Sequence, residues 1–393
     1  MKILFPYLAK WDSANRSRYH QLLTQLCLIG HQVFVLKAPN MALGDISFAE
    51  MNTGLSDIKN LTISEFEAPP ALRKFMQMQL PKSKLLKKGL LSLSSVDQVR
   101  RFTAEEEIDL LMVYNLPQVR LLENVECHKH FDLADDLIAM LGYESGIAGK
   151  AGVLAAAQYT QNRMLEMADT VTVASSVLKD QIETTTHLLP NGADLTALDQ
   201  AVPSAWITEK PGSWVGFVGA FEYWVDFELM LRVARRMRHV NFLIVGGGRL
   251  FPQIKQTVEE GNFKNVHLTG ALPYDEAMNC MAAMNICLVP FTRDAVSDGS
   301  SPLKLFEYAA LRKPIICTPI DEVKRMGKGW VSFGEDAADF THAIEDLLGN
   351  PKKAQEMADE GRSQVEKYFN WPVLAQQFLK VVSKQSRLAG IGV

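Results

Sequence analysis

The sequence predicts an α/β fold with two doubly wound, Rossmann-like domains in one chain. First, expected strands and helices alternate through the first half in the way that a parallel sheet requires. Second, the alternation starts again after residue 213. Third, the chain has 393 residues, which is too many for one ordinary core and fits two domains of about 200 residues each.

The first half opens with the short apolar run KILFPYL (2–8), a polar loop and a helix at 18–30. Gly30 ends that helix and HQVFVLKAP (31–39) is the next strand, so these segments form a parallel crossover. A further helix is expected at 158–168, and further strands are expected at 61–66, 109–117, 127–134 and 170–175.

The second half repeats the alternation. Its expected strands are 214–221, 241–248, 265–272, 286–291 and 313–319, and its expected helices are 226–237, 274–284, 340–350 and one helix within 300–312. The join near 200–212 predicts an N-terminal domain of residues 1–200 and a C-terminal domain of residues 201–372. The last segment, 373–393, is a helix that either packs back on the first domain or closes the second.

Composition excludes several classes of protein. A hydrophobic content of 47% with 22% charged residues indicates a soluble globular protein, and the net charge of -4 gives no reason to expect a nucleic-acid partner. The five cysteines have no metal-ligand or redox spacing, which predicts reduced thiols in a cytoplasmic protein. The sequence offers no signal peptide and no apolar stretch of about 20 residues, so we expect a protein of the cytoplasm or the inner membrane face.

The strongest candidate site is SSPLKLFEYAALRKPII (300–316), which predicts a loop, one helix and the start of a buried strand. Ser300, Ser301 and Pro302 form the expected helix start, with a hydroxyl N-cap, proline in the first turn and free amides that could donate to phosphate oxygens. Lys304 and Glu307 share one face there and suit a diphosphate and the two hydroxyls of a ribose. Spacing alone equally allows a solvated Lys–Glu pair.

Two strand ends that carry glycines could also approach a ligand. Gly219 ends one strand, and Gly247 lies among three glycines that directly precede Arg249. A tight strand-to-helix turn explains either motif about equally well. The second motif lacks GxGxxG spacing because its last position is Phe251, which counts against a nicotinamide-dependent enzyme.

The stretch PLKLFEYAALRKPII resembles a segment of glycosyltransferases of the GT-B fold, especially group 1-like bacterial enzymes that build surface polysaccharides. LLPNGADL (188–195) is similar to their exit from the first domain, and 218–230, 243–248, 266–291 and 369–379 follow in the family's order. The resemblance implies two domains that face each other across a cleft. It also implies transfer of a sugar from a nucleotide-diphosphate donor, expected to be a UDP-sugar, to a hydroxyl of a glycan or lipid-linked glycan, without a further cofactor.

By this resemblance Glu307 binds the donor ribose. Lys304, with the neighbouring Ser301, Pro302 and Leu303, holds the diphosphate. Gly219, Gly247 and Arg249 complete the expected donor site.

The chain also departs from the family pattern. Gly299, with Asp298 beside it, stands where many relatives have a second glutamate, and Ala220 stands where many have an arginine. The diphosphate charge then falls mainly on Lys304, together with Arg249. These departures resemble a subgroup that includes xanthan-type and teichuronic-acid-type transferases.

The first half is expected to supply the acceptor contacts and a proton acceptor. FDLADDLIAML (131–141) sets Asp132, Asp135 and Asp136 just after an expected strand. An inverting transferase needs a carboxylate within hydrogen-bond reach of the acceptor hydroxyl, so Asp135 or Asp136 is the candidate base. A helix cap is at least as good an explanation for each of them taken singly.

Asn15, Arg16 and Arg18 follow the first strand and are expected to lie on the acceptor side. No DxD motif lies near a strand end and no His/Cys set has metal spacing, so a metal-independent reaction without metal ligands is expected.

The segment 69–94 is basic and rich in leucine and methionine. It suggests contact with an anionic bilayer that carries a lipid-linked acceptor, although a solvated helix over the first domain is equally possible. Its basic residues are Arg73, Lys74, Lys82, Lys84, Lys87 and Lys88.

Two other functions stay open at this point. A nucleotide-sugar epimerase can share the two-lobed fold, but it needs acid and base groups around a single sugar. A non-catalytic protein derived from a transferase would bind glycan without turning over a donor.

Overall fold

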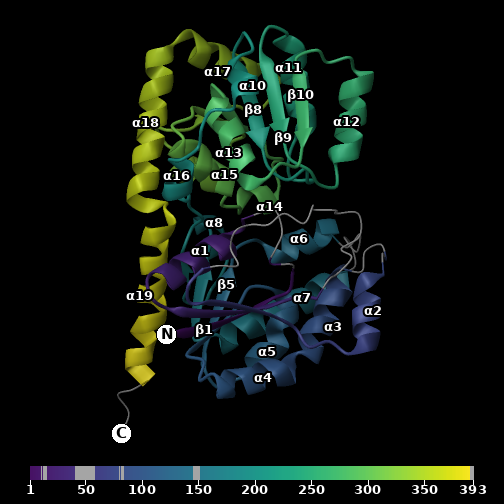
Figure 1. Ribbon diagram of the computed structural model, residues 1–393, viewed down its shortest axis with the longest axis vertical. Coiled ribbons are helices and arrows are strands. Elements are labelled where there is room, and N and C mark those ends of the chain that lie inside the picture. The colour runs from purple at the N-terminus through teal and green to yellow at the C-terminus, as the bar shows by residue number, and fades with distance from the viewer. Residues whose placement is uncertain are drawn as a thin grey trace. The chain divides into compact units, whose positions relative to one another are not determined.

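The computed structural model describes residues 1–9, 11, 16–39, 58–78, 80, 84–144 and 151–389. The chain divides into two compact units, one of Met1–Pro190 with Leu374–Val393 and one of Asn191–Val373. Each unit is an open sheet of parallel strands with helices packed against it (Figure 1). The prediction of two doubly wound α/β domains is confirmed.

The first unit contains a seven-stranded sheet in the order β3-β2-β1-β4-β5-β6-β7, and its strand order reverses between β1 and β4. The strands are β1 (Lys2–Tyr7), β2 (Gln32–Lys37), β3 (Leu61–Glu65), β4 (Leu110–Val113), β5 (His128–Leu133), β6 (Thr170–Val173) and β7 (His187–Leu188). Strand β4 (LLMV) is buried at every position, as expected for the centre of a sheet covered on both faces.

The helices of the first unit connect these strands as parallel crossovers. They are α1 (Arg18–Leu28), α2 (Pro70–Gln77), α3 (Lys84–Ser94), α4 (Val96–Glu105), α5 (Val119–Glu123), α6 (Leu137–Glu144), α7 (Ala151–Met167) and α8 (Ser176–Asp180). Leu91 of α3, Val99 of α4, Leu122 of α5 and Met164 of α7 meet in one core with the central strands.

The second unit contains a six-stranded parallel sheet in the order β10-β9-β8-β11-β12-β13, which reverses between β8 and β11. The strands are β8 (Trp214–Val218), β9 (Asn241–Val245), β10 (Val266–Gly270), β11 (Ile286–Val289), β12 (Ile315–Cys317) and β13 (Ser332–Phe333). The helices that concern the site are α11 (Phe227–Arg236), α12 (Phe251–Glu260), α13 (Tyr274–Ala283), α14 (Ala295–Asp298), α15 (Leu303–Ala310) and α16 (Asp321–Met326).

Capping residues fix where several of these helices begin. Asp226 accepts a hydrogen bond of 2.7 Å from the Leu229 amide at the start of α11, and Asp336 caps α17 (Ala337–Gly349) in the same way. Arg235 and Arg236 lie in the last turn of α11, where positive charge interacts favourably with the helix dipole.

The chain ends with α18 (Pro351–Tyr368) and α19 (Trp371–Ala389), drawn in yellow in Figure 1. From Leu374 onward α19 belongs to the first unit. There the Phe378 ring packs edge-on against His130 of β5, with the ring centroids 4.9 Å apart. In the part of the chain that the structure describes, no helix is long and apolar enough to cross a membrane.

Candidate functional site

Helix α15 begins at the carboxyl end of the second sheet, just beyond the strand-order reversal. This is where open α/β sheets place their ligands. Its N-cap residue is Pro302, so the first-turn amides of Leu303 and Lys304 have no acceptor within the helix. Such amides, at the positive end of the helix dipole, form a favourable site for phosphate oxygens.

Ser301 does not cap α15, contrary to the expectation from sequence. It is buried, and its hydroxyl accepts a hydrogen bond of 3.1 Å from the Asn191 amide. The Asn191 side chain donates to the Ser301 carbonyl at 2.6 Å. The serine therefore anchors the loop before the helix, and the amides of α15 keep their donors for another partner.

The Lys304 ammonium lies between two aromatic rings. Its Nζ is 4.7 Å from the centroid of Phe291 and 5.0 Å from that of Phe217. Both distances are within cation–π range. Burial lowers the pKa of Lys304 to about 8, against the opposing attraction of Glu307. A diphosphate would bring further negative charge next to this ammonium.

Glu307 lies one turn further into α15. Its Oε1 accepts a hydrogen bond of 3.1 Å from the Tyr274 hydroxyl at the start of α13. Burial raises the pKa of Glu307 above its usual range, while Tyr274 and Lys304 act in the opposite direction. A partly buried carboxylate held by one phenol is a suitable acceptor for neighbouring sugar hydroxyls.

Two glycine loops touch at the ends of β8 and β9. A Cβ atom on Gly246 would lie 1.9 Å from the Gly219 carbonyl oxygen, so only glycine fits at position 246. A Cβ on Gly219 would lie 2.8 Å from Lys304 Cε, which places this backbone directly beside the lysine. Gly247 has more space, because its nearest neighbour would be Ala271 at 3.4 Å.

Arg249 follows these glycines. Its Nε lies 3.3 Å from Oε2 of the buried Glu222, in the loop after β8, and its guanidinium carbon lies 5.9 Å from the centre of the Tyr223 ring. The planar guanidinium carries five N–H donors, a geometry that suits phosphate and carboxylate groups. Glu222 fixes the position of the cation that the sequence singled out.

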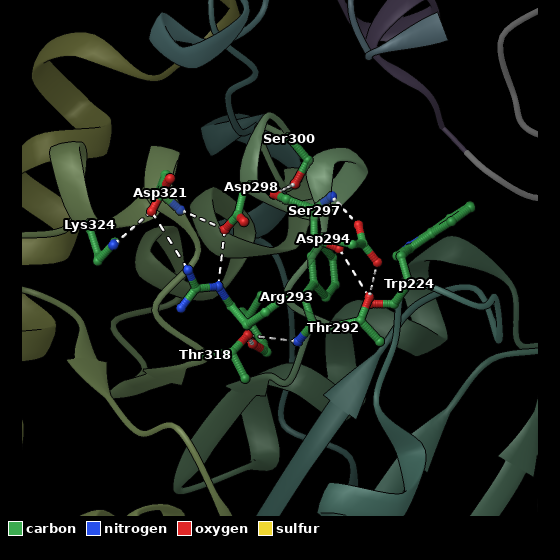
Figure 2. A network of polar contacts seen from close by, with 12 residues as sticks. Trp224, Thr292, Arg293, Asp294, Ser297, Asp298, Ser300, Thr318, Asp321 and Lys324 are labelled. Carbon is green, nitrogen blue, oxygen red and sulfur yellow. Dashed lines mark hydrogen bonds and ion pairs between the residues drawn. The ribbon is translucent and has the colours of Figure 1, made fainter. Parts of the chain in front are cut away.

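A polar network holds the loop that joins β11 to α15 (Figure 2). Asp294 accepts from the Thr292 hydroxyl at 2.7 Å and from the Ser297 amide at 2.9 Å, which caps the short α14. The Thr292 amide donates to the Trp224 carbonyl at 2.9 Å, and the Ser300 hydroxyl donates to the Ser297 carbonyl at 2.8 Å. The loop is thus fixed on both sides of α14.

Asp298, beside the position where many relatives carry a glutamate, belongs to the same network. Its Oδ1 accepts from Arg293 Nε and from the Asp321 amide, both at 3.1 Å, and Asp321 pairs with Lys324 at 2.6 Å (Figure 2). These contacts tie the loop before α15 to the start of α16. In this arrangement Asp298 supports the loop.

In the first unit, Arg18 differs from the expectation that it faces the acceptor. It is 3% exposed and forms a two-pronged ion pair with the fully buried Asp132, at 2.8 and 2.9 Å, and it donates to the Pro190 carbonyl at 3.0 Å. Burial disfavours the Asp132 carboxylate, but Arg18 outweighs it and the pKa of Asp132 lies below its ordinary value. Thr172 also donates to Asp132 at 2.6 Å. The Arg18–Asp132 ion pair is therefore part of the buried interior of the first unit.

The two candidate bases have different surroundings. Asp136 caps α6, because its Oδ1 accepts from the amides of Ile138 at 3.1 Å and Ala139 at 2.8 Å. Asp135 is exposed in the turn between β5 and α6. Arg16 is half-buried just before α1, and Asn15 lies outside the described residues.

Not all basic residues of the segment 69–94 lie at the protein surface. Lys87 is fully buried and donates to the carbonyls of Met76 at 3.0 Å and Met78 at 2.6 Å. Lys82 lies outside the described residues. The outer side of α3 instead shows leucines, including Leu86 at 57% exposure and Leu93 at 58%.

Sequence reasoning missed the aromatic groups around α15. Phe217 lies in β8, Phe291 follows β11 and Tyr274 begins α13, so no local pattern connects them with α15. Tyr308 was missed as well: its buried hydroxyl accepts from the Val218 amide at 2.8 Å and ties α15 to β8.

The described residues contain no group of three or more His, Cys, Asp or Glu side chains that could hold a metal ion. All five cysteines are free, and four of them are buried.

Comparisons with known proteins agree with this geometry. Residues 212–350, within the second unit, match the family model of the glycosyl transferases group 1. The glycosyltransferase TuaH of Bacillus subtilis, named for teichuronic acid biosynthesis, is 25% identical over 241 residues, which are 57% of this chain and 59% of TuaH. The match thus spans about three fifths of that relative's length.

Two solved structures show the same fold over nearly the whole chain. Sucrose-phosphate synthase from Thermosynechococcus elongatus has a TM-score of 0.78 at 17% identity and covers 99% of this chain and 100% of its own. Anabaena HepE in complex with UDP and glucose has a TM-score of 0.70 at 14% identity, and the match covers 98% of this chain and 99% of HepE. The family match covers residues 212–350, and the chain as a whole has the GT-B fold of these structures, as the resemblance in its sequence implied.

Proposed function

We propose that this protein transfers a hexose from a nucleotide-diphosphate sugar to a hydroxyl of a glycan or lipid-linked glycan. The observation that carries the proposal is the arrangement at α15, where free amides, Lys304 and the Tyr274–Glu307 pair meet at the carboxyl end of the sheet. Each group suits one part of a nucleotide sugar. The second unit would bind the donor and the first unit the acceptor.

The donor would bind through complementary charge. The diphosphate accepts from the Leu303 and Lys304 amides and from the Lys304 ammonium, with Arg249 as a second cation, while Glu307 accepts the ribose hydroxyls. The HepE structure contains UDP, which favours uridine as the base. The helix terminus and Lys304 stabilise the negative charge on the leaving diphosphate, so the reaction needs no metal ion.

The proton acceptor would come from the first unit. Asp135 is the better of the two candidates, because it is exposed whereas Asp136 is half-buried and caps α6. In the transfer, the carboxylate removes the acceptor hydroxyl proton, the oxygen forms a bond to the anomeric carbon, and the bond from that carbon to the diphosphate breaks. A well-placed base of this kind contributes about 10²–10⁴-fold in rate.

The acceptor would lie at a membrane surface next to α3. The helix exposes Leu86, Leu90 and Leu93 on successive turns, and Lys88 lies beside them. An apolar stripe on a basic helix fits the boundary of an anionic bilayer. Co-sedimentation with vesicles tests this membrane contact. Binding should increase with the fraction of phosphatidylglycerol and should fall in the double variant Leu86→Ser/Leu93→Ser. Equal binding to neutral vesicles would contradict the membrane contact.

A panel of nucleotide sugars tests the proposed activity. One or a few nucleotide sugars should raise the melting temperature of the protein. With these donors, free nucleotide should form only when an acceptor glycan is added. An epimerase would convert the sugar without an acceptor, and a glycan-binding protein would leave the donor intact. Asp135→Asn should slow nucleotide release about 10²–10⁴-fold but keep donor binding, whereas unchanged release would refute its role as the base.

A further inference from the structure

A pocket lies in the first unit, apart from the residues already discussed for donor binding. Its volume is about 310 Å³, and it lies where β5 and β6 end, between α6, α7 and α8. Leu133, the last residue of β5, and Leu178, in the helix after β6, form part of its wall. Neighbouring parallel strands end here, so the pocket lies at the carboxyl edge of the sheet.

The polar lining of this pocket consists mainly of amides. Three of its four polar residues are glutamines, Gln158, Gln161 and Gln181, and the fourth is Asp136. The other five lining residues are aliphatic. We call this site the glutamine pocket.

Gln161 is the residue that points to a ligand. It is only 9% exposed, and among the described residues its Oε1 has no hydrogen-bond partner. A buried amide oxygen without a partner is unfavourable and calls for an explanation. A ligand hydroxyl that donates to Oε1 would provide one.

The lining also restricts the chemistry of the ligand. No Lys, Arg or His lines the pocket and Asp136 brings a negative charge, so an anion is disfavoured. A single carboxylate does not make a metal site. Amides donate and accept at the same time, which matches hydroxyl groups, and the aliphatic wall suits the C–H face of a ring.

We propose that the glutamine pocket binds an uncharged sugar ring of the acceptor, an inference that rests on the proposed transferase function. The volume is at the lower end of the usual range for small-molecule sites, about 300–1,000 Å³, which suits one ring better than a nucleotide sugar. Asp136, held by two backbone amides of α6, presents a fixed carboxylate to the ring's hydroxyls.

Ligand-observed NMR on the full chain tests the proposal. The probes are methyl glucoside, methyl galactoside, methyl mannoside and methyl N-acetylglucosaminide, each compared with glucuronic acid and glucose 1-phosphate. At least one neutral glycoside should bind with a millimolar Kd, and Gln161→Leu should weaken it about fivefold, as expected for the loss of a hydrogen bond. The two anionic sugars should bind more weakly.

Two further variants control for misfolding. Gln181 is exposed, so Gln181→Ala should leave the fold intact and still weaken the glycoside at least twofold. Gln256→Leu, a glutamine-to-leucine change on the exposed side of α12, should have no effect. Binding that is unchanged in Gln161→Leu and Gln181→Ala, or that is stronger for an anionic sugar, would overturn the proposal.

UDP binding, measured by calorimetry on the same samples, separates this proposal from the proposed function. If UDP binds and no neutral glycoside does, the glutamine pocket is not a sugar site. If a glycoside binds through Gln161 while neither UDP nor any other nucleotide binds, the glutamine pocket is confirmed as a sugar site and the proposed transferase function is refuted.

Discussion

The surroundings of Lys304 predict how donor affinity depends on pH. The pKa of Lys304 is lowered to about 8 in the free protein, and a bound diphosphate would raise it again because it stabilises the ammonium. Donor binding above pH 8 therefore requires uptake of a proton. The dissociation constant then grows by the factor 1 + 10^(pH − 8), so affinity should fall about tenfold between pH 7 and pH 9.

Calorimetry with UDP-glucose, or with the nucleotide sugar selected by thermal shift, measures this dependence directly. The matched control is Lys304→Arg, because a guanidinium stays protonated throughout this range. Its affinity should be flat from pH 7 to pH 9, whatever its absolute value, and dividing one profile by the other removes titration of the ligand. A wild-type profile as flat as that of Lys304→Arg would refute the reasoning.

Three further predictions concern neighbouring contacts. Tyr274→Phe removes the hydroxyl that donates to Glu307, so the pKa of Glu307 should rise further. In steady-state kinetics near pH 6.5 the donor KM should increase about fivefold with little change in kcat, and an unchanged KM would show that the contact is dispensable. Gly246→Ala should lower the free energy of unfolding by about 2 kcal/mol or more in urea, because its Cβ would overlap a carbonyl oxygen, whereas Gly247→Ala should be nearly neutral; similar values for both would contradict the loop geometry. Asp132→Asn leaves a buried guanidinium without its counter-charge and should cost about 3–5 kcal/mol in the same measurement, and a loss below 1 kcal/mol would contradict the described core.

Much of the fold follows from local patterns. The strand–helix alternation and the second start near residue 214 depend on hydrophobic periodicity, which each segment carries by itself. Helix α15 and the shared face of Lys304 and Glu307 follow in the same way from spacing. Such features need no knowledge of distant contacts.

The electrostatics of the proposed donor site depend on residues in other segments of the chain. The rings of Phe217 and Phe291 and the hydroxyl of Tyr274 reach α15 only because parallel strands end at one edge of the sheet. Ser301 has the right type and position for a cap, yet Asn191, 110 residues earlier, uses its hydroxyl. No local pattern could reveal that competition.

Charge in a loop was also a poor guide to exposure. Arg18 follows a strand and resembles a ligand-binding residue, but Asp132, 114 residues away, draws it into the core. Lys87 belongs to a basic run and is buried by two backbone carbonyls. In both cases hydrogen-bond acceptors outside the residue's own helix compensate the cost of burying the charge.

The most direct test of the donor site is a crystal structure with UDP bound. We expect the diphosphate within hydrogen-bond distance of the Leu303 and Lys304 amides and of Lys304 Nζ, with a ribose hydroxyl donating to Glu307. Density for the nucleotide at any other place, or none at saturating UDP, would contradict the account.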